Sequence, residues 1–551
     1  MKHIMKIAAV ATVAALTLSG CFKDLDTPPI DPNVTQVFQQ DGVFAKIYGT
    51  LGLTGIGSGD AGEGSGDVDG IDEGTSAFYR MQWELNEFPA DDIWWVWGDP
   101  GIPALRAMEW DASNDLVKGL YARLYFDIAI CNYFLKETDG LSDEKTSKQR
   151  AEVRFIRALN YYLLLDMYGE GVPFAEKLID ELPVQPNDLP NPVTRKELFT
   201  WLEGELKEIE PLMYADGTKT AYYRVDQTAV WLLLSRMYLN AEVYTGTAKW
   251  TEAAQYAGKV MSSSYKLAPV YRHLFMGDND KLSPYNKASQ EIILPIAQDG
   301  IQTRCYGGSL FLLAASHANG MSPWGITEQW TCMRAKSTLV KKFFPDLNAA
   351  KNIKADLNGM PGLAVDDRCL LESEVVAADD TPFTFSLEGG AGNGDGAFTK
   401  GWGFAKWSNL YAQPNTQSQD PKYPDMDIPY LRASEAYLTY AEAVSRGGTA
   451  TNGTALDAVN ELRKRANATE WTAAELTLPN LLDEWSREFY GEGRRRIDLV
   501  RHNKFAGAVG YNWEGKGGIA TGKDVDAKYN IYPIPLTDLT ANQNLKPSPG
   551  Y

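Results

Sequence analysis

The sequence is poor in histidine, a residue on which much enzyme chemistry depends. Only 4 of its 551 residues are histidines, and one of these lies within the first twenty positions. The remaining three, His273, His317 and His502, leave little scope for a histidine general base, a catalytic triad or a zinc site. We interpret each of them as structural.

Cysteine and long hydrophobic runs are scarce as well. After Cys21 the chain has only four cysteines, without a CxxC pair or regular spacing, at positions 131, 305, 332 and 369. This pattern is not that of a metal cluster or a disulfide framework, and it predicts buried free thiols with at most one or two isolated disulfides. The apolar run at residues 7–18 is too short to span a bilayer.

Positive charge is in deficit. The chain has 53 lysines and arginines against 72 acidic residues, a net charge of −19, which becomes −21 (51 minus 72) without the first twenty residues. An acidic surface of this kind repels phosphate backbones, so nucleic acid is excluded as a partner. A composition that is 44% hydrophobic and 11% aromatic indicates an ordered globular protein.

The N-terminus has the layout of a secreted, lipid-anchored protein. Two lysines precede the apolar run, and Leu18-Ser19-Gly20-Cys21 resembles a bacterial lipobox, in which cleavage leaves the cysteine to be acylated. We predict a signal peptide at residues 1–20 and a lipidated tether at residues 21–40. Three acyl chains on Cys21 would anchor the protein stably. The alternative is an ordinary signal peptide with Cys21 left as a thiol.

Helical periodicity dominates the rest of the chain. Residues 149–168 form an amphipathic pattern that glycines 169 and 171 end, and 291–296 is the clearest strand-like run. Small residues recur at helical spacing in two pairs of segments, 226–240 with 250–257 and 431–443 with 455–466, as in tetratricopeptide hairpins. We predict an all-α fold, a tetratricopeptide-like helical-repeat scaffold with long decorating loops at 52–74 and 386–403.

Large rings gather in segments that also contain glycine and other loop residues. These segments are Trp94-Trp95-Val96-Trp97, Tyr306-Gly307-Gly308 and the stretch from Trp324 to Trp330. Aromatic faces cover the C–H patches of sugar rings, and a long glycan suits several rings set along an arc. Because aromatic residues are more often core than ligand platforms, the pattern alone leaves both interpretations open.

The acidic residues offer one candidate metal site. Asp278-Asn279-Asp280, with Glu291 downstream, supplies the hard oxygen ligands that calcium takes, although a solvated loop is the alternative. Other acids lie on helix faces beside basic residues, as Glu484 and Glu488 do, or in the glycine-rich loop. Neither arrangement indicates the buried acid with a raised pKa that a glycosidase needs.

Several long motifs give the chain a resemblance to a known family. They are Arg150-Ala-Glu-Val-Arg through Asp166-Met-Tyr-Gly-Glu-Gly-Val-Pro, and the segments 231–241, 428–438, 484–500, 532–535 and 549–551. On these motifs, which keep the family order, the chain resembles the SusD/RagB family of outer-membrane glycan-binding lipoproteins. The resemblance implies a single SusD-like body at 41–551, with an N-terminal region of about 41–265 and a C-terminal region of about 270–551.

The resemblance also implies a function, since it is closest to a starch-binding member of the family. A surface lipoprotein of this kind binds starch-like α-glucan on the extracellular face of the outer membrane and delivers it to a SusC-like TonB-dependent transporter, without enzymatic activity. Other surface glycan-binding lipoproteins are further expected partners. The short acidic stretch Lys23-Asp24 after the lipid cysteine fits export to the outer face.

The resemblance carries site residues as well. The positions that match the sugar-binding arc are Trp95, Tyr306 and Trp330, with Trp97 nearby, and Arg80 and Asp72 match polar contacts. It also implies a calcium site in the region of Asp280.

One departure affects the expected specificity. The loop Gly98-Asp99-Pro100-Gly101 is one residue shorter than in the starch-binding relative, and a sugar-contacting asparagine there has no clear counterpart. Asp99 is the candidate substitute. The alternatives are the same role for another α-glucan or a fructan, a helical-repeat scaffold that binds only proteins through its tryptophans, and a glycosidase.

Overall fold

The computed structural model describes residues 37–56, 65–178, 188–316, 324–350, 353, 366–372 and 402–551. The predicted signal peptide, Cys21, most of the tether and His317 lie outside the described residues, as does most of the loop predicted at 386–403. Residues Phe44–Tyr551 form one compact unit. Among the described residues, every helix is too short or too polar to span a bilayer.

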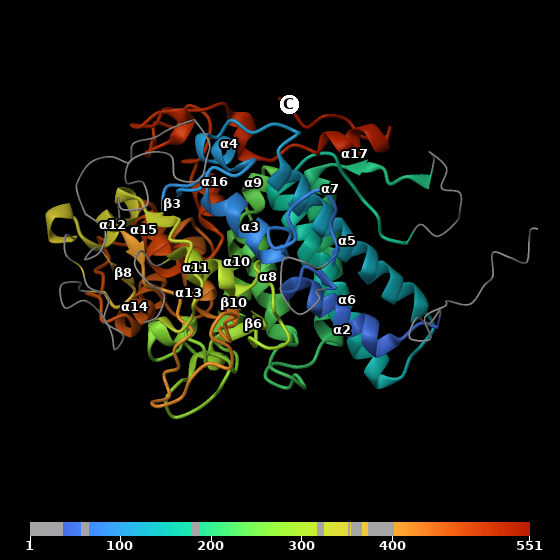
Figure 1. Cartoon of the computed structure of the whole chain (residues 1–551), viewed down its shortest axis with the longest axis horizontal. Helices are drawn as coiled ribbons and strands as arrows, with labels where there is room; N and C mark the ends of the chain where they lie inside the picture. The colour runs from blue at the N-terminus through green and yellow to red at the C-terminus, as the bar shows by residue number, and fades with distance from the viewer. Residues whose placement is uncertain are drawn as a thin grey trace, which may run out of the picture. The chain divides into compact units, whose positions relative to one another are not determined.

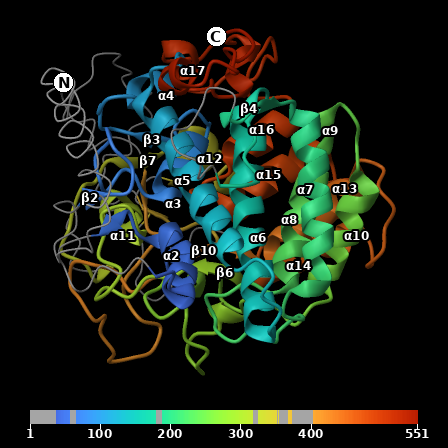
Figure 2. The ribbon, with the colours of Figure 1, turned by 90° about the vertical axis from the view of Figure 1, so that its right-hand side faces the viewer.

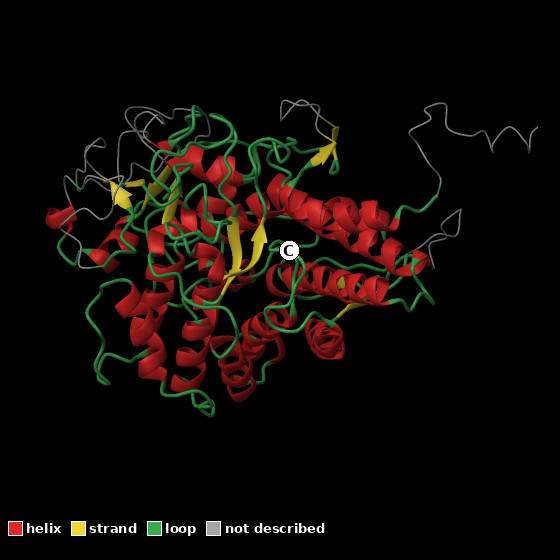
Figure 3. Cartoon of the chain, turned by 90° about the horizontal axis from the view of Figure 1, so that it is seen from below, coloured by secondary structure: helices red, strands yellow, loops and turns green. Residues whose placement is uncertain are grey.

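The described residues are mainly helical, which confirms the predicted all-α class. The α-helices are α2 (Gln40–Gly52), α3 (Phe78–Glu87), α4 (Ile102–Ala107), α5 (Asp115–Glu137), α6 (Glu144–Leu163), α7 (Arg195–Ile209), α8 (Gln227–Leu239), α9 (Ala241–Thr245), α10 (Trp250–Met261), α11 (Ser309–Ser316), α12 (Ser337–Phe343), α13 (Ser434–Ser445), α14 (Ala455–Arg465), α15 (Leu478–Phe489), α16 (Arg495–Arg501) and α17 (Leu536–Ala541). Figure 1 shows their places in the chain, and Figure 3 shows how few strands accompany them.

The longest helices pack as successive antiparallel neighbours of a tetratricopeptide-like scaffold. Helix α5 packs on α6 and α6 on α7, while α8 packs on α10 and α13 on α14, the two hairpins that the sequence predicts (Figure 2). Helix α10 also packs on α13, so the hairpins stack on each other. Its fully buried Ala253, Ala254 and Ala257 allow this close approach. The scaffold thus needs small residues at the positions where helices meet.

The ends of the helices follow local chemistry. Asp226 accepts a hydrogen bond from the Thr228 backbone N–H and caps α8, as predicted. Helix α6 continues into a π-helical turn, η1 (Leu164–Tyr168), which ends at Gly169 in a left-handed conformation with φ of 72°. The predicted stop at this glycine is confirmed. A side chain would strain this conformation, which glycine adopts readily.

Short antiparallel strand pairs connect distant parts of the chain. The predicted strand is β6 (Ile292–Ile296), and its partner β10 (Ile428–Arg432) includes the beginning of the segment predicted as the helix 431–443. The helix therefore begins later, at Ser434 of α13, because backbone pairing with β6 holds the preceding residues extended. The other pairs are β1 (Gly55–Ile56) with β2 (Ser65–Gly66), β3 (Ile93–Trp95) with β7 (Met333–Ala335), β4 (Val172–Pro173) with β5 (Pro192–Val193), and β8 (Leu371–Glu372) with β9 (Gly403–Phe404).

A buried ionic network closes the C-terminal half onto the N-terminal half. Four arginines of the segment 494–501 pair with buried acids. Arg495 pairs with Asp91 before β3 and Arg496 with Asp166 of η1, both in the N-terminal half, and Arg494 and Arg501 pair with Glu435 and Glu442 of α13. Nearby, burial would raise the pKa of Glu488, but Arg465, Arg432 and Arg368 outweigh burial and hold it well below its usual value. The arginines of the segment 494–501 therefore have a structural role.

The scarce residues are structural too, where the structure describes them. Cys131, Cys305, Cys332 and Cys369 are buried free thiols, as predicted. His502 lies in the ionic network, with Nε2 3.0 Å from a carboxylate oxygen of Glu442.

Candidate functional site

The largest gathering of predicted site residues is an open cleft of about 570 Å³. It is lined by Gly70, Ile71, Asp72, Thr75, Arg80, Glu84, Trp97, Asp99, Pro100, Ile102, Asp115, Leu116, Tyr306 and Trp330. The cleft thus combines the loop before α3, one face of α3, the loop after β3, the start of α5 and two distant loops. Six residues singled out in the sequence meet here.

Three half-buried rings form a row along the cleft. The ring centroids of Trp97 and Trp330 are 5.5 Å apart with planes tilted by 36°, and those of Tyr306 and Trp330 are 6.2 Å apart with a tilt of 33°. The ring planes are tilted, so the rings do not stack face to face on one another, and all three side chains line the cleft. The row therefore suits an extended ligand with repeated apolar faces.

The pairing of β3 with β7 brings two of the rings together. Trp95 pairs with Met333, and the next backbone N–H, of Val96, donates to the Cys332 carbonyl at 2.7 Å. The residues that follow along this ladder are Trp97 on one strand and the Trp330 segment on the other. Sequence reasoning predicts the two tryptophans as site residues but not this pairing.

The backbone at Trp330 is held in an unusual conformation. Its N–H and that of Thr331 both donate to the Ala314 carbonyl in α11, at 2.7 and 3.0 Å. Thr331 has a φ of 49°, a left-handed conformation that a β-branched residue rarely adopts. Such strain gathers at binding sites, where the surrounding structure fixes a side chain. Here the two hydrogen bonds and the conformation of Thr331 fix the backbone that carries the Trp330 ring.

Trp95 is not part of the row, and its assignment to the sugar-binding arc is wrong. Its side chain is 0% exposed, and its ring packs against Trp83, Phe88 and Trp97 at centroid distances of 5.8, 5.3 and 6.1 Å. A ring enclosed on all sides cannot stack on a ligand. Trp97, which follows the end of the strand, is half-buried and lines the cleft.

Tyr306 is positioned by close backbone packing and by a lysine. A Cβ atom on Gly307 would lie 2.2 Å from the Gly74 carbonyl oxygen, and one on Gly74 would lie 2.6 Å from the Tyr306 Cβ. Only glycines allow the Tyr306 loop to approach the Asp72 loop so closely. The Lys422 Nζ donates to the Tyr306 hydroxyl at 2.9 Å, a contact that the sequence does not indicate.

Helix α3 contributes an arginine and a glutamate to the cleft. The Arg80 Nε donates to Glu84 Oε1 at 2.9 Å, and its guanidinium carbon lies 5.6 Å from the Trp330 ring centroid. Glu84 is fully buried, and its Oε2 atom has no hydrogen-bond partner among the described residues. Sequence reasoning missed Glu84, although its spacing of four residues from Arg80 places both on one face of the helix.

Burial changes the acidity of Glu84. It raises the pKa of this carboxyl, although Arg80 opposes the rise. The sequence pattern predicts no buried acid with a raised pKa, and for the cleft this prediction is wrong. The acids predicted there, Asp72 and Asp99, are exposed. Asp72 Oδ1 accepts hydrogen bonds from the Thr75 N–H and hydroxyl, both at 3.0 Å, which fixes its direction.

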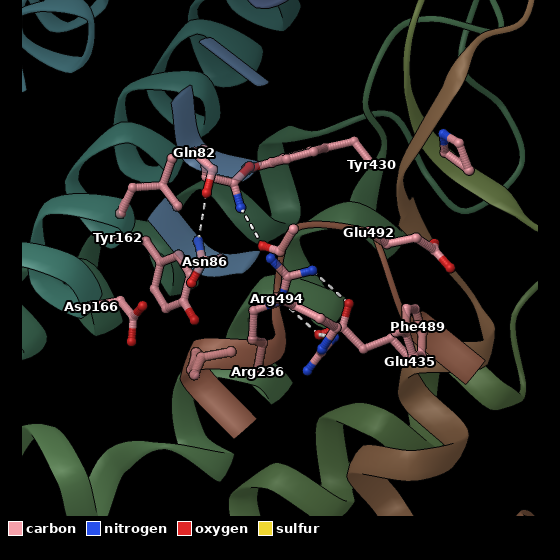
Figure 4. A pocket seen from close by; sticks show the side chains of 14 residues that line it. Gln82, Asn86, Tyr162, Asp166, Arg236, Tyr430, Glu435, Phe489, Glu492 and Arg494 are labelled. Atoms are coloured by element: carbon pink, nitrogen blue, oxygen red, sulfur yellow. Dashed lines mark hydrogen bonds and ion pairs between the residues drawn. The ribbon is translucent and has the colours of Figure 1, made fainter. Parts of the chain in front are cut away.

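A second cavity, shown in Figure 4, lies in the interior and is lined mainly by polar side chains. Gln82 donates to the Gly493 carbonyl, and Arg236 and Arg494 both pair with Glu435. Its volume of about 40 Å³ holds a few water molecules at most. It is therefore part of the packing of α3 against the C-terminal half, and not a site for a sugar.

The predicted calcium ligands do not meet as a group. Asp278 accepts hydrogen bonds from the Asn286 side chain and the Ala412 N–H, at 2.9 and 3.0 Å. Glu291 is ion-paired with Arg432 and Arg465, at 3.0 and 3.2 Å. In the described ranges no group of three or more histidine, cysteine or acidic side chains is arranged as metal ligands. These partners explain why Glu291 is not available to a cation.

Asp280 differs from the other two acids. Its Oδ1 atom is buried without a hydrogen-bond partner in the part of the chain that the structure describes. Burial raises the pKa of Asp280, with Asp278 and Asp425 contributing and Lys281 opposing. The same carboxyl contributes to the raised pKa of Asp427, for which burial is the main cause.

Comparison with known proteins agrees with the fold. The chain belongs to the SusD family, and its residues 378–551 match the model of that family. It is similar to the starch-binding protein SusD of Bacteroides thetaiotaomicron, with 41% identity over 569 residues that cover 100% of this chain and 99% of the relative.

Solved structures share the architecture at lower identity. The surface glycan-binding protein A from Bacteroides thetaiotaomicron, in complex with laminarihexaose, has a TM-score of 0.65 and 18% identity, with 92% of this chain and 98% of that chain covered. The protein of the same name from Bacteroides fluxus has a TM-score of 0.64 and 18% identity, with 93% and 99% covered. The predicted tetratricopeptide-like, SusD-like fold is confirmed.

Proposed function

We propose that this protein captures starch-like α-glucan in the cleft of Trp97, Tyr306 and Trp330. The observation that carries the proposal is the row of three tilted, half-buried rings. Aromatic faces cover the C–H surfaces of successive sugar rings and leave the hydroxyl groups free. The 41% identity to a starch-binding protein favours α-glucan over other polymers.

The polar side chains around the row supply the remaining contacts. In this proposal Arg80 donates hydrogen bonds to sugar hydroxyls, and Asp72 and Asp99 accept them. The cleft is open, so much of the contact energy is offset by ordering the ligand and the side chains. We therefore expect modest affinity for short oligosaccharides and tighter binding of polymers.

In the cell, we propose that the protein is anchored through Cys21 on the outer face of the outer membrane and passes the glycan to a SusC-like TonB-dependent transporter. The lipobox sequence and membership of the SusD family support this role. Other surface glycan-binding lipoproteins are proposed as further partners. We assign no catalytic residue, and new reducing ends after incubation with amylopectin would point instead to Glu84 and the exposed acids of the cleft.

Affinity gels containing amylopectin test the binding proposal. The soluble protein lacking residues 1–21 should be retarded, and a Trp97→Ala, Trp330→Ala double variant should migrate as in a gel without glycan. Equal retardation of both proteins would place the site elsewhere. An unretarded wild type would contradict the α-glucan assignment, and gels with dextran, pullulan and fructan would then identify another polymer. If the protein binds none of these polymers, the result would favour the alternative that it is a scaffold that binds only proteins.

We also propose that calcium binds at Asp280, whose carboxyl interacts electrostatically with Asp425 and Asp427. The buried, unpartnered Oδ1 atom of Asp280 supports this site, and calcium prefers carboxylate oxygens. The ion would offset repulsion among these acids. We expect calcium to raise the melting temperature relative to chelator in the wild type but not in an Asp280→Asn variant. Identical melting of the wild type in calcium and chelator would contradict the site.

A further inference from the structure

A second groove lies beside the cleft on helix α5. The helix begins at Asp115 and Leu116, both of which line the cleft. Farther along the same helix, side chains spaced three and four residues apart line a groove of about 340 Å³, namely Lys118, Tyr121, Ala122 and Tyr125. Residues with this spacing lie on one face of a helix. One face of α5 therefore leads from the cleft into the groove.

The opposite wall of the groove comes from distant segments. It consists of Pro173, Leu189 and Pro190 and of residues in or beside α17, drawn in red in Figure 1: Pro535, Thr537, Asp538, Ala541 and Asn542. Proline rings and aliphatic side chains make most of this wall apolar. Threonine, aspartate and asparagine add a few polar atoms, so the wall has the mixed character that sugars require.

The tyrosines of the groove are fixed in place. The ring centroids of Tyr121 and Tyr125 are 4.7 Å apart. The Tyr121 hydroxyl donates to Asp538 Oδ2 at 2.5 Å, and the Tyr125 hydroxyl donates to the Pro173 carbonyl at 2.6 Å. Tyr121 is largely buried and Tyr125 is half-buried. Tyr121 occupies one oxygen of the Asp538 carboxylate, which leaves the other oxygen to accept a hydrogen bond from a ligand.

Cleft and groove adjoin at Lys118. Its ammonium group pairs with Asp115 of the cleft at 3.0 Å, while its side chain lines the groove. The same nitrogen lies 3.9 Å from the position of a Cβ atom on Gly70, another cleft residue. From Asp115 to Tyr125 the helix rises about 15 Å. A polymer can occupy both hollows at once, whereas a single sugar cannot.

We propose that the groove of Tyr121, Tyr125 and Asp538 is a further subsite for the same glycan chain, which takes sugar units that extend beyond the aromatic cleft. The inference rests on the proposed function. The groove makes a specific prediction: the affinity of the protein for glycan should depend on the length of the glycan chain. Short oligosaccharides fill the cleft alone, while long chains gain the contacts of the groove as well.

The test compares maltotriose, a long maltooligosaccharide and amylopectin by calorimetry and affinity gels. A Tyr125→Ala, Asp538→Ala double variant should bind the long chains about five- to tenfold more weakly, the loss of a contact worth about 1 kcal/mol or somewhat more. Its affinity for maltotriose should equal that of the wild type, which also shows that the variant is folded. A Tyr285→Ala variant, whose ring is exposed outside the groove, is the matched control.

Unchanged affinity of the double variant for the long chains would overturn the proposal. If the double variant loses both ligands, a single Asp538→Asn variant, which keeps an acceptor for Tyr121, replaces it. Wild-type affinity of that variant for long chains, with normal maltotriose binding, would also overturn the proposal. A wild-type protein that binds no α-glucan would instead contradict the proposed function itself, and the comparison would then use whichever glycan it binds.

Discussion

Two tryptophans only two positions apart have opposite surroundings. Trp95 is enclosed by other rings, whereas Trp97 is half-buried at the cleft. All three residues of β3 are buried, so the alternation that usually separates the two faces of a strand gives no signal there. The signal that does separate them is the loop sequence Gly98-Asp99-Pro100, which shows that the chain leaves the strand at Trp97.

We expect substitution of the two kinds of tryptophan to affect different properties. Trp95→Ala should lower the free energy of unfolding by about 3–5 kcal/mol, because it leaves a cavity among packed rings. Trp330→Ala should weaken amylopectin binding at least fivefold, which corresponds to about 1 kcal/mol, with a smaller loss of stability. Urea unfolding and affinity gels measure the two effects. Loss of binding by Trp95→Ala without loss of stability would contradict the assignment.

A buried acid on α5 makes stability depend on pH. Burial raises the pKa of Asp127 from its ordinary value of 3.8 to about 7. Because the folded pKa is above the unfolded one, the native state keeps a proton that the unfolded chain releases, and stability falls as pH rises between these values. Asp127→Asn removes this dependence. The unfolding free energy of the variant minus that of the wild type should therefore increase by roughly 2–3 kcal/mol from pH 5 to pH 8.

Urea unfolding at both pH values measures that change. The control is Asp139→Asn, because the side chain of Asp139 is 85% exposed. We expect its effect to be the same at pH 5 and pH 8. An Asp127→Asn variant that behaves like this control would contradict the raised pKa.

Only some of the other cleft residues could be predicted from the sequence. Tyr306, Trp330, Trp97, Arg80 and Asp72 were singled out and do meet in one cleft, while their role in glycan binding stays a prediction. Lys422 was missed because it lies 116 residues from the tyrosine that it contacts, and no local pattern encodes such a pair.

At the scale of elements, two loops are packed through their glycines. The loop before α3 and the loop before α11 touch where Gly74 faces Gly307. A Cβ atom on Gly307 would also lie 2.3 Å from the Ala77 Cβ, so one of the two loops must move to admit it. The position of the Tyr306 ring therefore depends on the absence of one methyl group.

We expect Gly307→Ala to shift Tyr306 and weaken amylopectin binding severalfold, with α3 and α11 still formed. Gly204→Ala is the matched control, since Gly204 lies in α7 with nothing within 4 Å of the added carbon. That substitution should stabilise the helix by about 0.5–1 kcal/mol and leave binding unchanged. Affinity gels and thermal melting measure both properties, and normal binding by Gly307→Ala would refute the packing argument.

The helices themselves were predictable from periodicity, and the strands were mostly not. Long amphipathic segments such as α6 and α8 were expected close to their observed bounds, because burying one face gives a repeating pattern. Only the end of strand β10, residues 431–432, lies in the segment predicted as a helix. Its pairing with β6 could not be predicted, because the two strands are far apart in the sequence and no local pattern encodes such a pair.

At the scale of the whole molecule, the arginines of the segment 494–501 hold its two halves together. Both oxygens of Asp91 receive hydrogen bonds from Arg495, at 2.6 and 3.0 Å, and both side chains are almost completely buried. Burial would raise the pKa of Asp91, but Arg495 and Lys342 outweigh burial and lower it. Stability from this pair is therefore present above the unfolded pKa near 4 and is lost as pH falls below it.

We expect Arg495→Gln to lower the free energy of unfolding by about 3–5 kcal/mol at pH 7, because it leaves buried carboxylates without their partner. The loss should be smaller near pH 3, where the unfolded carboxyl is already protonated. Urea unfolding at the two pH values tests this, and an equal loss at both would contradict the ionic explanation. The family motifs predicted that this segment matters, but not which acid each arginine contacts.

Helix α3 is held in place by a residue near the C-terminal end of the chain, and this contact affects when the cleft can form during folding. The Trp83 indole N–H donates to the carbonyl of Gly491, a residue 408 positions later. Helix α3 also carries Arg80 and Glu84, so the cleft is complete only after almost all of the polypeptide has been synthesised and folded. Long-range contacts of this kind form late. We therefore expect copies that are truncated before Gly491 to bind amylopectin more weakly than the complete chain.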